Sequence, residues 1–317
     1  MESNVHFPTD LNLLWDACRK CIELIVKLCK NYNVLGWRKA KDWKKELKGL
    51  MRTCTQINKT TVADKKERLK KASKEYVKKT YELEGKIYKS IKELKEKSLS
   101  ILEKIKIERL EYFQNMLIKH IDLIERRLLK GERIAHDEKI FSLFEPHTEW
   151  INKGKDYKKI ELGHKLLITT CQYGLVLDYK VMEQSVDSKE TLELADRLLN
   201  IYGDNAINSL SFDKGFSNKN DRELLELYIE NLVMPKKGKL NKADKERESH
   251  NKFKKLRNYH SAIEANINWL EHHGLNRCLD KGLDGFKRYA GFGILAYNLH
   301  KIGNNLLEKQ RQLKKAA

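Results

Sequence analysis

A long stretch with helical periodicity, residues 62–130, most constrains how this 317-residue chain can fold. Apolar residues recur there mostly at steps of three and four residues or their sums, while lysine and glutamate fill the other positions. This spacing places the apolar side chains on one face of a helix. Gly85 is the only glycine in the stretch, and the whole chain has 3 prolines and 16 glycines, so few residues interrupt helices. We therefore predict an antiparallel helical hairpin or a coiled coil.

Shorter helical patterns lie on either side of this stretch. The pattern from Leu11 to Lys30 predicts one helix, and residues 37–53 predict a second, more basic one. From about residue 243 to the end the pattern is helical again, with breaks expected at Gly274 and at residues 282–285.

The periodicity changes at residue 139, where strands replace helices. Residues 139–145, 160–170 and 175–182 are predicted to form three strands of an antiparallel meander. A helix at 188–202, a strand at 207–212, a helix at 220–227 and a strand at 229–234 are expected to follow. The chain is thus predicted to be α+β and mostly helical, and three antiparallel strands followed by αβαβα is the order of a ribonuclease-H-like mixed sheet.

The charge of the chain indicates a polyanionic partner. Its net charge is +19 and its pI is near 9.4, beyond what solubility requires, which favours nucleic acid over a membrane surface. No run of 18 apolar residues is present, so no transmembrane helix is expected. The first residues lack the pattern of a signal peptide, and we expect a cytoplasmic protein.

The cysteines do not form a metal-binding pattern. Cys18 and Cys21 have a spacing found in metal and redox sites, but no second pair completes a zinc site. Cys18 instead shares one helical face with Trp15, Ile22, Ile25 and Cys29. We predict buried, reduced thiols.

An acid follows a short apolar run at residues 207–212. Asp213 comes directly after the run, and Gly215 follows two residues later. This pattern is typical of a buried strand that places a carboxylate at its carboxyl end before a sharp turn. Open α/β sheets bind ligands at that end of their strands, although most such turns only close a loop.

A second acid lies on a predicted helix further along the chain. His260 and Glu264 are four residues apart, so His260 lies one turn before the carboxylate. A single acid among many basic residues also fits a surface ion pair.

Several motifs resemble the DDE transposases of bacterial insertion sequences, and the resemblance extends over essentially the whole chain. The motifs are His6-Phe-Pro-Thr-Asp-Leu-Asn-Leu-Leu-Trp-Asp16, Phe144-Glu-Pro-His-Thr-Glu-Trp-Ile151, Glu161-Leu-Gly-His-Lys165, Ser211-Phe-Asp-Lys-Gly-Phe216, Met234-Pro-Lys-Lys-Gly-Lys239, His260-Ser-Ala-Ile-Glu264, Leu270-Glu-His-His-Gly-Leu-Asn-Arg-Cys278 and Gly285-Phe-Lys-Arg-Tyr289.

The resemblance implies a ribonuclease-H-like core in which three acids hold two divalent metal ions. Asp213 matches the second acid and Glu264 the third, so both are implied to be catalytic and metal-binding, with Mg²⁺ or Mn²⁺ as the cofactor. Its partner would be double-stranded DNA, as transposon ends and target, on which the protein is expected to form a homodimer. A basic strip is expected to bind DNA phosphates: Lys236, Lys237, Lys239, Lys252, Lys254, Lys255 and Arg257. His260 is a further implied DNA contact. His272 and His273 are interpreted as residues at a helix end, whose hydrogen bonds are made within their own turn.

The first acid of the family has no clear counterpart. Its position in the resembling family precedes the segment that matches Glu2 to Phe7, so we expect a chain shortened at its amino terminus. The alternative is that Asp137 or Glu145 supplies this acid. We expect residues 1–8 to be the tail of the first core strand, 9–135 a helical insertion, and 136–317 the catalytic core with its carboxyl-terminal helices.

Three functions fit these observations. The first is DNA strand cleavage and transfer by metal-dependent transesterification, possible only with a complete site. The second is a non-catalytic DNA-binding protein that retains the transposase fold. The third, a coiled-coil scaffold, explains residues 62–130 and leaves the predicted strands unexplained.

Overall fold

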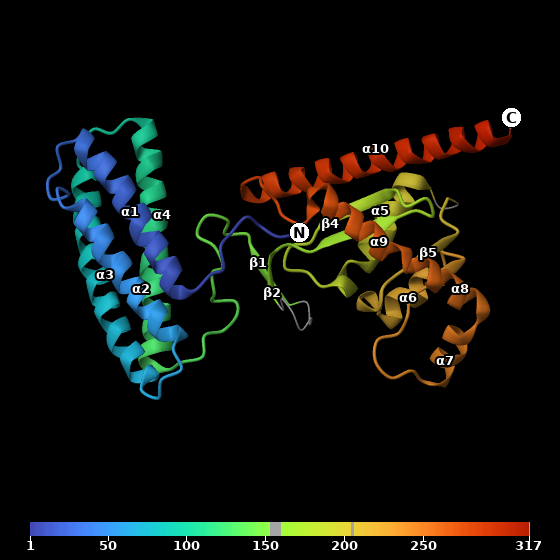
Figure 1. Ribbon diagram of the computed structural model, residues 1–317, viewed down its shortest axis with the longest axis horizontal. Coiled ribbons are helices and arrows are strands. Elements are labelled where there is room, and N and C mark those ends of the chain that lie inside the picture. The colour runs from blue at the N-terminus through green and yellow to red at the C-terminus, as the bar shows by residue number, and fades with distance from the viewer. Residues whose placement is uncertain (153–159, 204–205, 317) are drawn as a thin grey trace. The chain divides into compact units, whose positions relative to one another are not determined.

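The computed structural model describes residues 1–152, 160–203 and 206–316 (Figure 1). The chain divides into two compact units. One, which we call the helical unit, is Val5–Pro146. The other, which we call the mixed unit, combines Met1–Asn4 with His147–Ala317. The helical unit is therefore an insertion between a short amino-terminal segment and the remainder of the mixed unit.

The helical unit is built from four α-helices and a final π-helical turn (Figure 1). Their bounds are α1 Asp10–Asn31, α2 Ala40–Lys59, α3 Lys65–Lys95, α4 Ile101–Ile124 and η1 Glu125–Lys130. The two helices predicted before residue 62 are confirmed as α1 and α2, although α2 begins and ends later than expected. The predicted hairpin is confirmed as α3 and α4.

The ends of these helices follow from local sequence. Thr9 begins α1, because its hydroxyl accepts a hydrogen bond from Asn12 N–H at 3.2 Å. Ser100 and Glu103 form a capping box that begins α4 and turns the chain back along α3. The hairpin is antiparallel, since Glu84 accepts a hydrogen bond from Gln114 and Glu125 accepts one from Tyr81.

One core of apolar side chains holds the four helices together. Its fully buried members include Leu14, Leu47, Leu83 and Leu110, one from each helix. The predicted thiol face of α1 is confirmed: Cys18, Cys21 and Cys29 are free and buried. Burial raises the pKa of the Cys29 thiol to about 11, so this thiol is protonated at neutral pH.

The mixed unit contains six short strands and six α-helices among its described residues. The strands are β1 Glu149–Asn152, β2 Ile160–Gly163, β3 Leu166–Thr170, β4 Val176–Val181, β5 Ser209–Ser211 and β6 Asn231–Val233. The helices are α5 Thr191–Tyr202, α6 Lys219–Leu225, α7 Lys242–Ser249, α8 Asn251–His260, α9 Ala262–Leu270 and α10 Gly282–Ala316. β1 pairs antiparallel with β2, β3 antiparallel with β4, and β5 parallel with β6.

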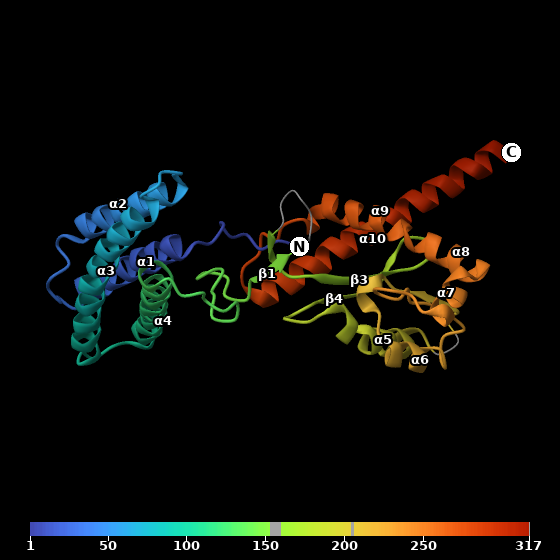
Figure 2. The ribbon, with the colours of Figure 1, turned by 90° about the horizontal axis from the view of Figure 1, so that it is seen from below.

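Helices cover both faces of these strands. Figure 2 shows β3 and β4 between α9 and α10 on one side and α5 and α6 on the other. Alternate residues of β3 point to opposite faces of the strand. Leu167 packs into the apolar core with α5 and α6, and Ile168 packs into the core with α10. The chain is thus a mostly helical α+β protein, as predicted, but the described strands form three two-stranded sheets instead of the single mixed sheet expected.

The strand predicted at 139–145 is wrong. These residues form no strand and belong to the helical unit. The Ser142 hydroxyl accepts hydrogen bonds from Phe144 N–H at 3.2 Å and Glu145 N–H at 3.0 Å, which turns the backbone. Leu143 O accepts a hydrogen bond from Tyr112 of α4 at 3.1 Å. The apolar residues of this segment therefore pack on a helix instead of entering a sheet.

The predicted meander is confirmed only for its last two strands, which pair antiparallel as β3 and β4. The strand expected at 160–170 is divided into β2 and β3 by His164 and Lys165, and β2 pairs with β1. The amino-terminal residues cause this division. His164 N–H donates to Met1 O at 3.1 Å, and a Cβ at Gly163 would lie only 2.2 Å from the same oxygen. Only glycine allows the two backbones to approach this closely.

The carboxyl-terminal helices break where predicted at Gly274. This glycine has φ +95°, outside the helical region, and ends the turn that follows α9. The helix α10 then begins at Gly282. None of the helices in the described ranges is both long and apolar enough to cross a membrane.

Replacing Leu83 with alanine tests the helical core. Leu83 is 0% exposed on α3, so Leu83→Ala should lower the free energy of unfolding by about 2–5 kcal/mol. Urea unfolding followed by far-UV circular dichroism measures the change. Ile118→Ala, at a largely exposed position of α4, is the control and should cost less than about 1 kcal/mol. Equal losses in both variants would contradict this core.

Candidate functional site

The parallel pairing of β5 and β6 positions the predicted acid. Ser209 pairs with Asn231 and Ser211 with Val233, and Phe212 N–H extends the pairing by donating to Val233 O at 2.8 Å. The carboxyl ends of parallel strands meet at one edge. Asp213, which follows β5, and the segment that follows β6 therefore leave the sheet on the same side.

Asp213 lies in the turn that the sequence predicts. It directly follows Phe212 and caps the short 3-10 helix Lys214–Phe216, since its Oδ1 accepts a hydrogen bond from Lys214 N–H at 2.7 Å. The side chain is exposed. An exposed carboxylate held by a backbone donor at a strand end is available to a bound metal ion or substrate.

A further acid, Asp187, lies beside this turn. A Cβ at Gly215 would be 2.5 Å from Asp187 Oδ2, so a larger residue there would displace the Asp187 carboxylate. Asp187 Oδ1 also accepts a hydrogen bond from Lys165 Nζ at 3.2 Å. The sequence carries no signal for this neighbour, because Asp187 precedes α5 and reaches the turn only through tertiary packing.

The segment after β6 is tied to the turn by its backbone. Lys237 N–H donates to Ser217 Oγ at 3.2 Å, which holds the segment beside the Asp213 turn. Lys237 and Lys239 are exposed, and Gly238 between them has φ +87°, a conformation that favours glycine. Two predicted DNA contacts thus lie near the predicted acid.

Lys236 is instead engaged within the protein. Its ammonium group contacts the buried Asp244, and its N–H donates to Glu248 Oε1 at 2.8 Å. Asp244 also lies 3.6 Å from Arg222 Nη1 and accepts a bond from the Asn241 N–H in a capping box. The hydrogen bond from Lys236 lowers the pKa of the Asp244 carboxyl. The ion pair between Lys236 and Asp244 fixes the start of the loop formed by residues 236–239, which we call the basic loop.

The basic helix α8 packs against β5 and β6. Phe253 is buried on its inner face, while Lys254, Lys255 and Arg257 are exposed. Arg257 has one acidic neighbour, Glu248, at 3.8 Å. Three further predicted DNA contacts are therefore presented by a helix that lies on the same two strands as the acid.

His260 and Glu264 lie at the junction of α8 and α9. Ser261, between the helices, keeps right-handed helical angles of φ −60° and ψ −22°, so the predicted one-turn spacing is preserved. His260 is half-buried and Glu264 is exposed in the first turn of α9. No hydrogen bond or ion pair of the described residues joins Glu264 to Asp213.

The acids do not form a complete metal site among the described residues. In residues 1–152, 160–203 and 206–316, no group of three or more His, Cys, Asp or Glu side chains is placed to hold a metal ion. Asp137 and Glu145, the alternatives for a first acid, both lie in the helical unit. The predicted strand that was to end at Glu145 is absent, and Glu145 is buried.

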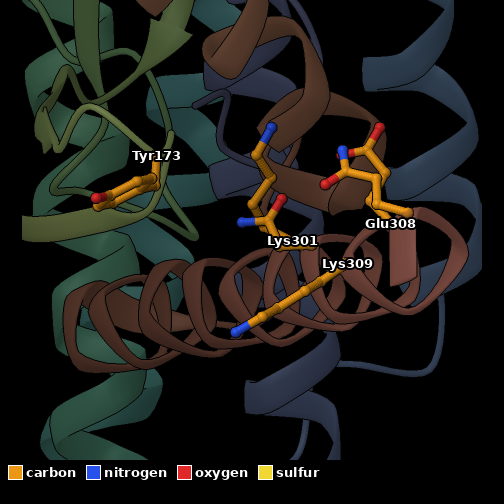
Figure 3. A pocket seen from close by; sticks show the side chains of 6 residues that line it. Tyr173, Lys301, Glu308 and Lys309 are labelled. Atoms are coloured by element: carbon orange, nitrogen blue, oxygen red, sulfur yellow. The ribbon is translucent and has the colours of Figure 1, made fainter. Parts of the chain in front are cut away.

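Two surface hollows lie among the described residues, and neither contains these acids. One, of about 340 Å³, lies between β6 and helices α7 and α8. Another, of about 290 Å³, lies between Tyr173 and the carboxyl-terminal half of α10, where Lys301, Glu308 and Lys309 line it (Figure 3). Neither hollow is lined by Asp213 or Glu264, which lie on open surface.

Two histidine pairs have structural roles. His273 Nδ1–H donates to Trp269 O at 2.8 Å, which confirms the interpretation of His273 as a helix end satisfied by its own turn, and its Nε2 lies 2.8 Å from His300 Nδ1. His147 and His164, from two of the motifs, are joined at 2.9 Å and stack on each other beside Phe286. Burial lowers the pKa of His164. The pair of His147 and His164 holds the segment around His164, whose N–H donates to Met1 O.

The comparison with protein families agrees with this arrangement. Residues 129–299 match the family model described as the transposase DDE domain. The match covers more than half of the chain and includes both Asp213 and Glu264. This match places the protein in the class of the DDE transposases. The chain belongs to the transposase DDE domain family. No curated protein and no solved structure matches the chain.

The ion pair at Asp244 makes stability depend on pH. The pKa of Asp244 is lower in the folded than in the unfolded chain, so its ionised form stabilises the fold above the unfolded value of about 3.9. That contribution is lost as the pH falls through the folded pKa. Asp244→Asn should therefore reduce stability most at neutral pH, with a difference from the wild type that shrinks below about pH 4.

Thermal unfolding at a series of pH values measures this difference. The matched control is Glu246→Gln, which replaces an exposed acid on the same helix. It should show the same dependence of melting temperature on pH as the wild type. If the loss of thermal stability in Asp244→Asn stays constant down to acid pH, the carboxylate charge is not the cause of that loss.

Proposed function

We propose that this chain acts on DNA by transposase-type strand cleavage and transfer. The observation that carries the proposal is the exposed Asp213 at the carboxyl end of a parallel strand, beside an exposed basic loop, in a chain of the transposase DDE domain family. Acids at this end of a strand can position the reacting phosphate, and lysines beside them can bind the DNA backbone.

We propose that the mixed unit is a ribonuclease-H-like core. Two features support this. The antiparallel pair β3–β4 is followed by α5, β5, α6 and β6, in the predicted order of helices and strands. The strands β5 and β6 are parallel, and buried clusters lie on both helix-covered sides.

Asp213 and Glu264 would hold Mg²⁺ or Mn²⁺. Their exposed carboxylates supply the hard oxygen ligands that magnesium prefers, and magnesium commonly takes one or two carboxylates together with water and phosphate oxygens. When bound, such an ion polarises the phosphate and activates the attacking oxygen. Asp213 is suited to this role because Lys214 N–H fixes one of its oxygens. The first acid of the family is not assigned to a described residue.

Exposed basic residues would bind the phosphates on both sides of Asp213. Lys237 and Lys239 lie on the loop after β6, and Lys254, Lys255 and Arg257 lie on α8. His260 would extend this surface toward Glu264. The DNA would be transposon ends and target, and the site of action the bacterial cytoplasm where an insertion sequence resides.

A second function is favoured by one observation. Among the described residues no three-acid group is placed for a metal ion, as expected of a DNA-binding protein that retains the transposase fold without its chemistry. The two functions differ in metal-dependent cleavage and share DNA binding.

Removing either acid should abolish cleavage and spare DNA binding. In a plasmid-nicking assay with Mg²⁺ or Mn²⁺, Asp213→Asn and Glu264→Gln should each lower the rate by about 100-fold or more, because metal-assisted displacement loses a ligand. Binding in the presence of EDTA should stay unchanged. The control Asp196→Asn removes an exposed acid of α5, which is neither a proposed ligand nor a residue of the Asp213 turn.

Nicking that survives both substitutions would overturn the assignment of the acids. A wild-type chain that binds DNA and does not nick it in either metal would instead support the second function.

The basic helix α8 should contribute to the salt dependence of DNA binding. Replacing Lys254 and Lys255 by alanine should reduce the slope of log K against log salt concentration by about 1.8, because each phosphate contact contributes about 0.9. Fluorescence anisotropy with a duplex at several salt concentrations measures the slope. The consecutive, exposed Lys70 and Lys71 of α3 form the matched control pair. An equal reduction in the control would indicate nonspecific loss of charge.

A further inference from the structure

Two histidines meet on the surface of the mixed unit, where the turn after α9 packs on α10 (Figure 2). His273 lies in this turn, the π-helical segment η4 Glu271–Leu275, and His300 lies on α10. Their facing ring nitrogens, His273 Nε2 and His300 Nδ1, are 2.8 Å apart. His300 is exposed and His273 is half-buried. Ions in solution can therefore reach both rings.

The hydrogen bonds of this pair show which nitrogen carries a proton. A backbone carbonyl only accepts, so His273 donates its Nδ1–H to Trp269 O at 2.8 Å, and its Nε2 keeps a free electron pair. Histidine ligands of metal ions are held in this way, with one nitrogen bonded to a carbonyl or carboxylate and the other facing the ion. His300 donates its Nδ1–H to that electron pair. A cation that binds both rings takes the place of this one proton.

The backbone beneath the pair is fixed by packing. A Cβ at Gly293 of α10 would lie 2.5 Å from Leu275 Cδ2, so α10 and the turn approach closely. Tyr297, one turn before His300, is buried, and its hydroxyl lies 3.1 Å from Asn266 Oδ1 of α9. These contacts set the positions of the two histidines before any ligand binds. A preformed pair of ligands loses little free energy to reorganisation.

The separation of the two nitrogens fits neighbouring ligands of one ion. Imidazole nitrogens bind divalent transition metals at about 2.0–2.1 Å, so two of them lie about 2.9 Å apart at a right angle and about 3.3 Å apart in a tetrahedron. The observed 2.8 Å is closer to the right angle of square-planar or tetragonal sites, the geometry typical of Ni²⁺ and Cu²⁺. The ring planes are inclined at 53°. Rotation about the last side-chain bond of histidine is soft, so both electron pairs can tilt toward an ion.

The other histidine pair of the mixed unit does not share these properties. The rings of His147 and His164 are stacked with 13° between their planes, so their in-plane electron pairs do not meet at one point. His164 is 1% exposed, and its Nδ1 lies 3.1 Å from both Met182 O and Glu149 Oε1. We therefore assign no ion to the buried pair.

We propose that His273 and His300 bind one Ni²⁺ or Cu²⁺ ion. No third His, Cys, Asp or Glu of the described residues is placed to complete this site, so water fills the remaining positions. Imidazole suits these ions, whereas Mg²⁺ and Mn²⁺ prefer oxygen ligands. When the ion binds, the proton of His300 Nδ1 moves through solvent to Nε2 of the same ring, and both rings stay neutral. The ion joins the turn η4 to α10, and its binding does not rest on the proposed function.

Isothermal titration of the full chain with Ni²⁺ tests this site. His300→Gln removes one ligand and keeps a polar side chain on α10. It should raise the dissociation constant of a one-to-one Ni²⁺ site by at least about tenfold, because loss of even a hydrogen-bond partner of a ligand costs about 10–100-fold. The matched control is His272→Gln, which replaces the exposed neighbouring histidine and should bind Ni²⁺ as the wild type does.

Two further titrations separate this site from the proposed catalytic one. Excess Mg²⁺ should not compete with Ni²⁺, because the two imidazoles offer no oxygen ligand. Asp213→Asn should leave Ni²⁺ binding unchanged. Failure of the nicking assay therefore leaves this site untouched, and failure of the Ni²⁺ titration leaves the proposed function untouched.

Trp269 provides a local reporter of Cu²⁺ binding. Its ring centroid lies 6.1 Å from that of His273 and 6.0 Å from that of His300. A paramagnetic ion held by both histidines should quench the fluorescence of this tryptophan. The saturable part of the quenching should be lost in His300→Gln, and also in Trp269→Phe, which keeps both ligands.

The outcomes decide whether this pair binds the ion. A wild-type chain without a saturable one-to-one Ni²⁺ site overturns the proposal. Equal affinity in His300→Gln, an equal loss in His272→Gln, or competition by Mg²⁺ overturns it as well. His273→Gln is the second variant, used if His300→Gln does not fold, and it should lose the same site. Thermal unfolding in EDTA confirms that the variants compared are folded.

Discussion

The parallel pairing of β5 with β6 is the constraint on which the candidate site depends. Parallel strands require a crossover, here α6, and they bring both carboxyl ends to one edge. Asp213 leaves one strand there and the basic loop leaves the other, and Lys237 N–H bonded to Ser217 Oγ joins the two segments. With an antiparallel pair, Asp213 and the loop after β6 would lie at opposite ends of the two strands, and they could not belong to one site.

Paired charges and backbone contacts fix the elements around this edge. Asp244, held between Lys236 and Arg222, anchors the beginning of the basic loop. Asn298 bonds both backbone groups of Val176 and so holds α10 along β4. The opposite face of α10 carries apolar side chains that do not pack on β4, among them Leu295, Leu299 and Leu306.

Much of the fold could be predicted from local sequence. Helical periodicity, the scarcity of glycine and proline, and the capping box at Ser100 specify the helical hairpin. The apolar run before Asp213 and the glycine after it specify a strand end and a turn. The strand expected at 139–145 failed because Ser142 bonds its own backbone and Tyr112 of α4 binds Leu143 O. The second bond joins segments distant in sequence, which no local pattern reveals.

The sequence by itself determined the helices of the helical unit, that Asp213 follows the end of a strand, and that the chain is strongly basic. These properties depend on side-chain periodicity, local hydrogen bonds and composition. Only the tertiary structure decided that Asp187 lies beside the Asp213 turn, that Lys236 is paired with Asp244, and that residues near Met1 divide a predicted strand in two. Each of these depends on contacts between segments far apart in the chain, which form only when the apolar faces pack together.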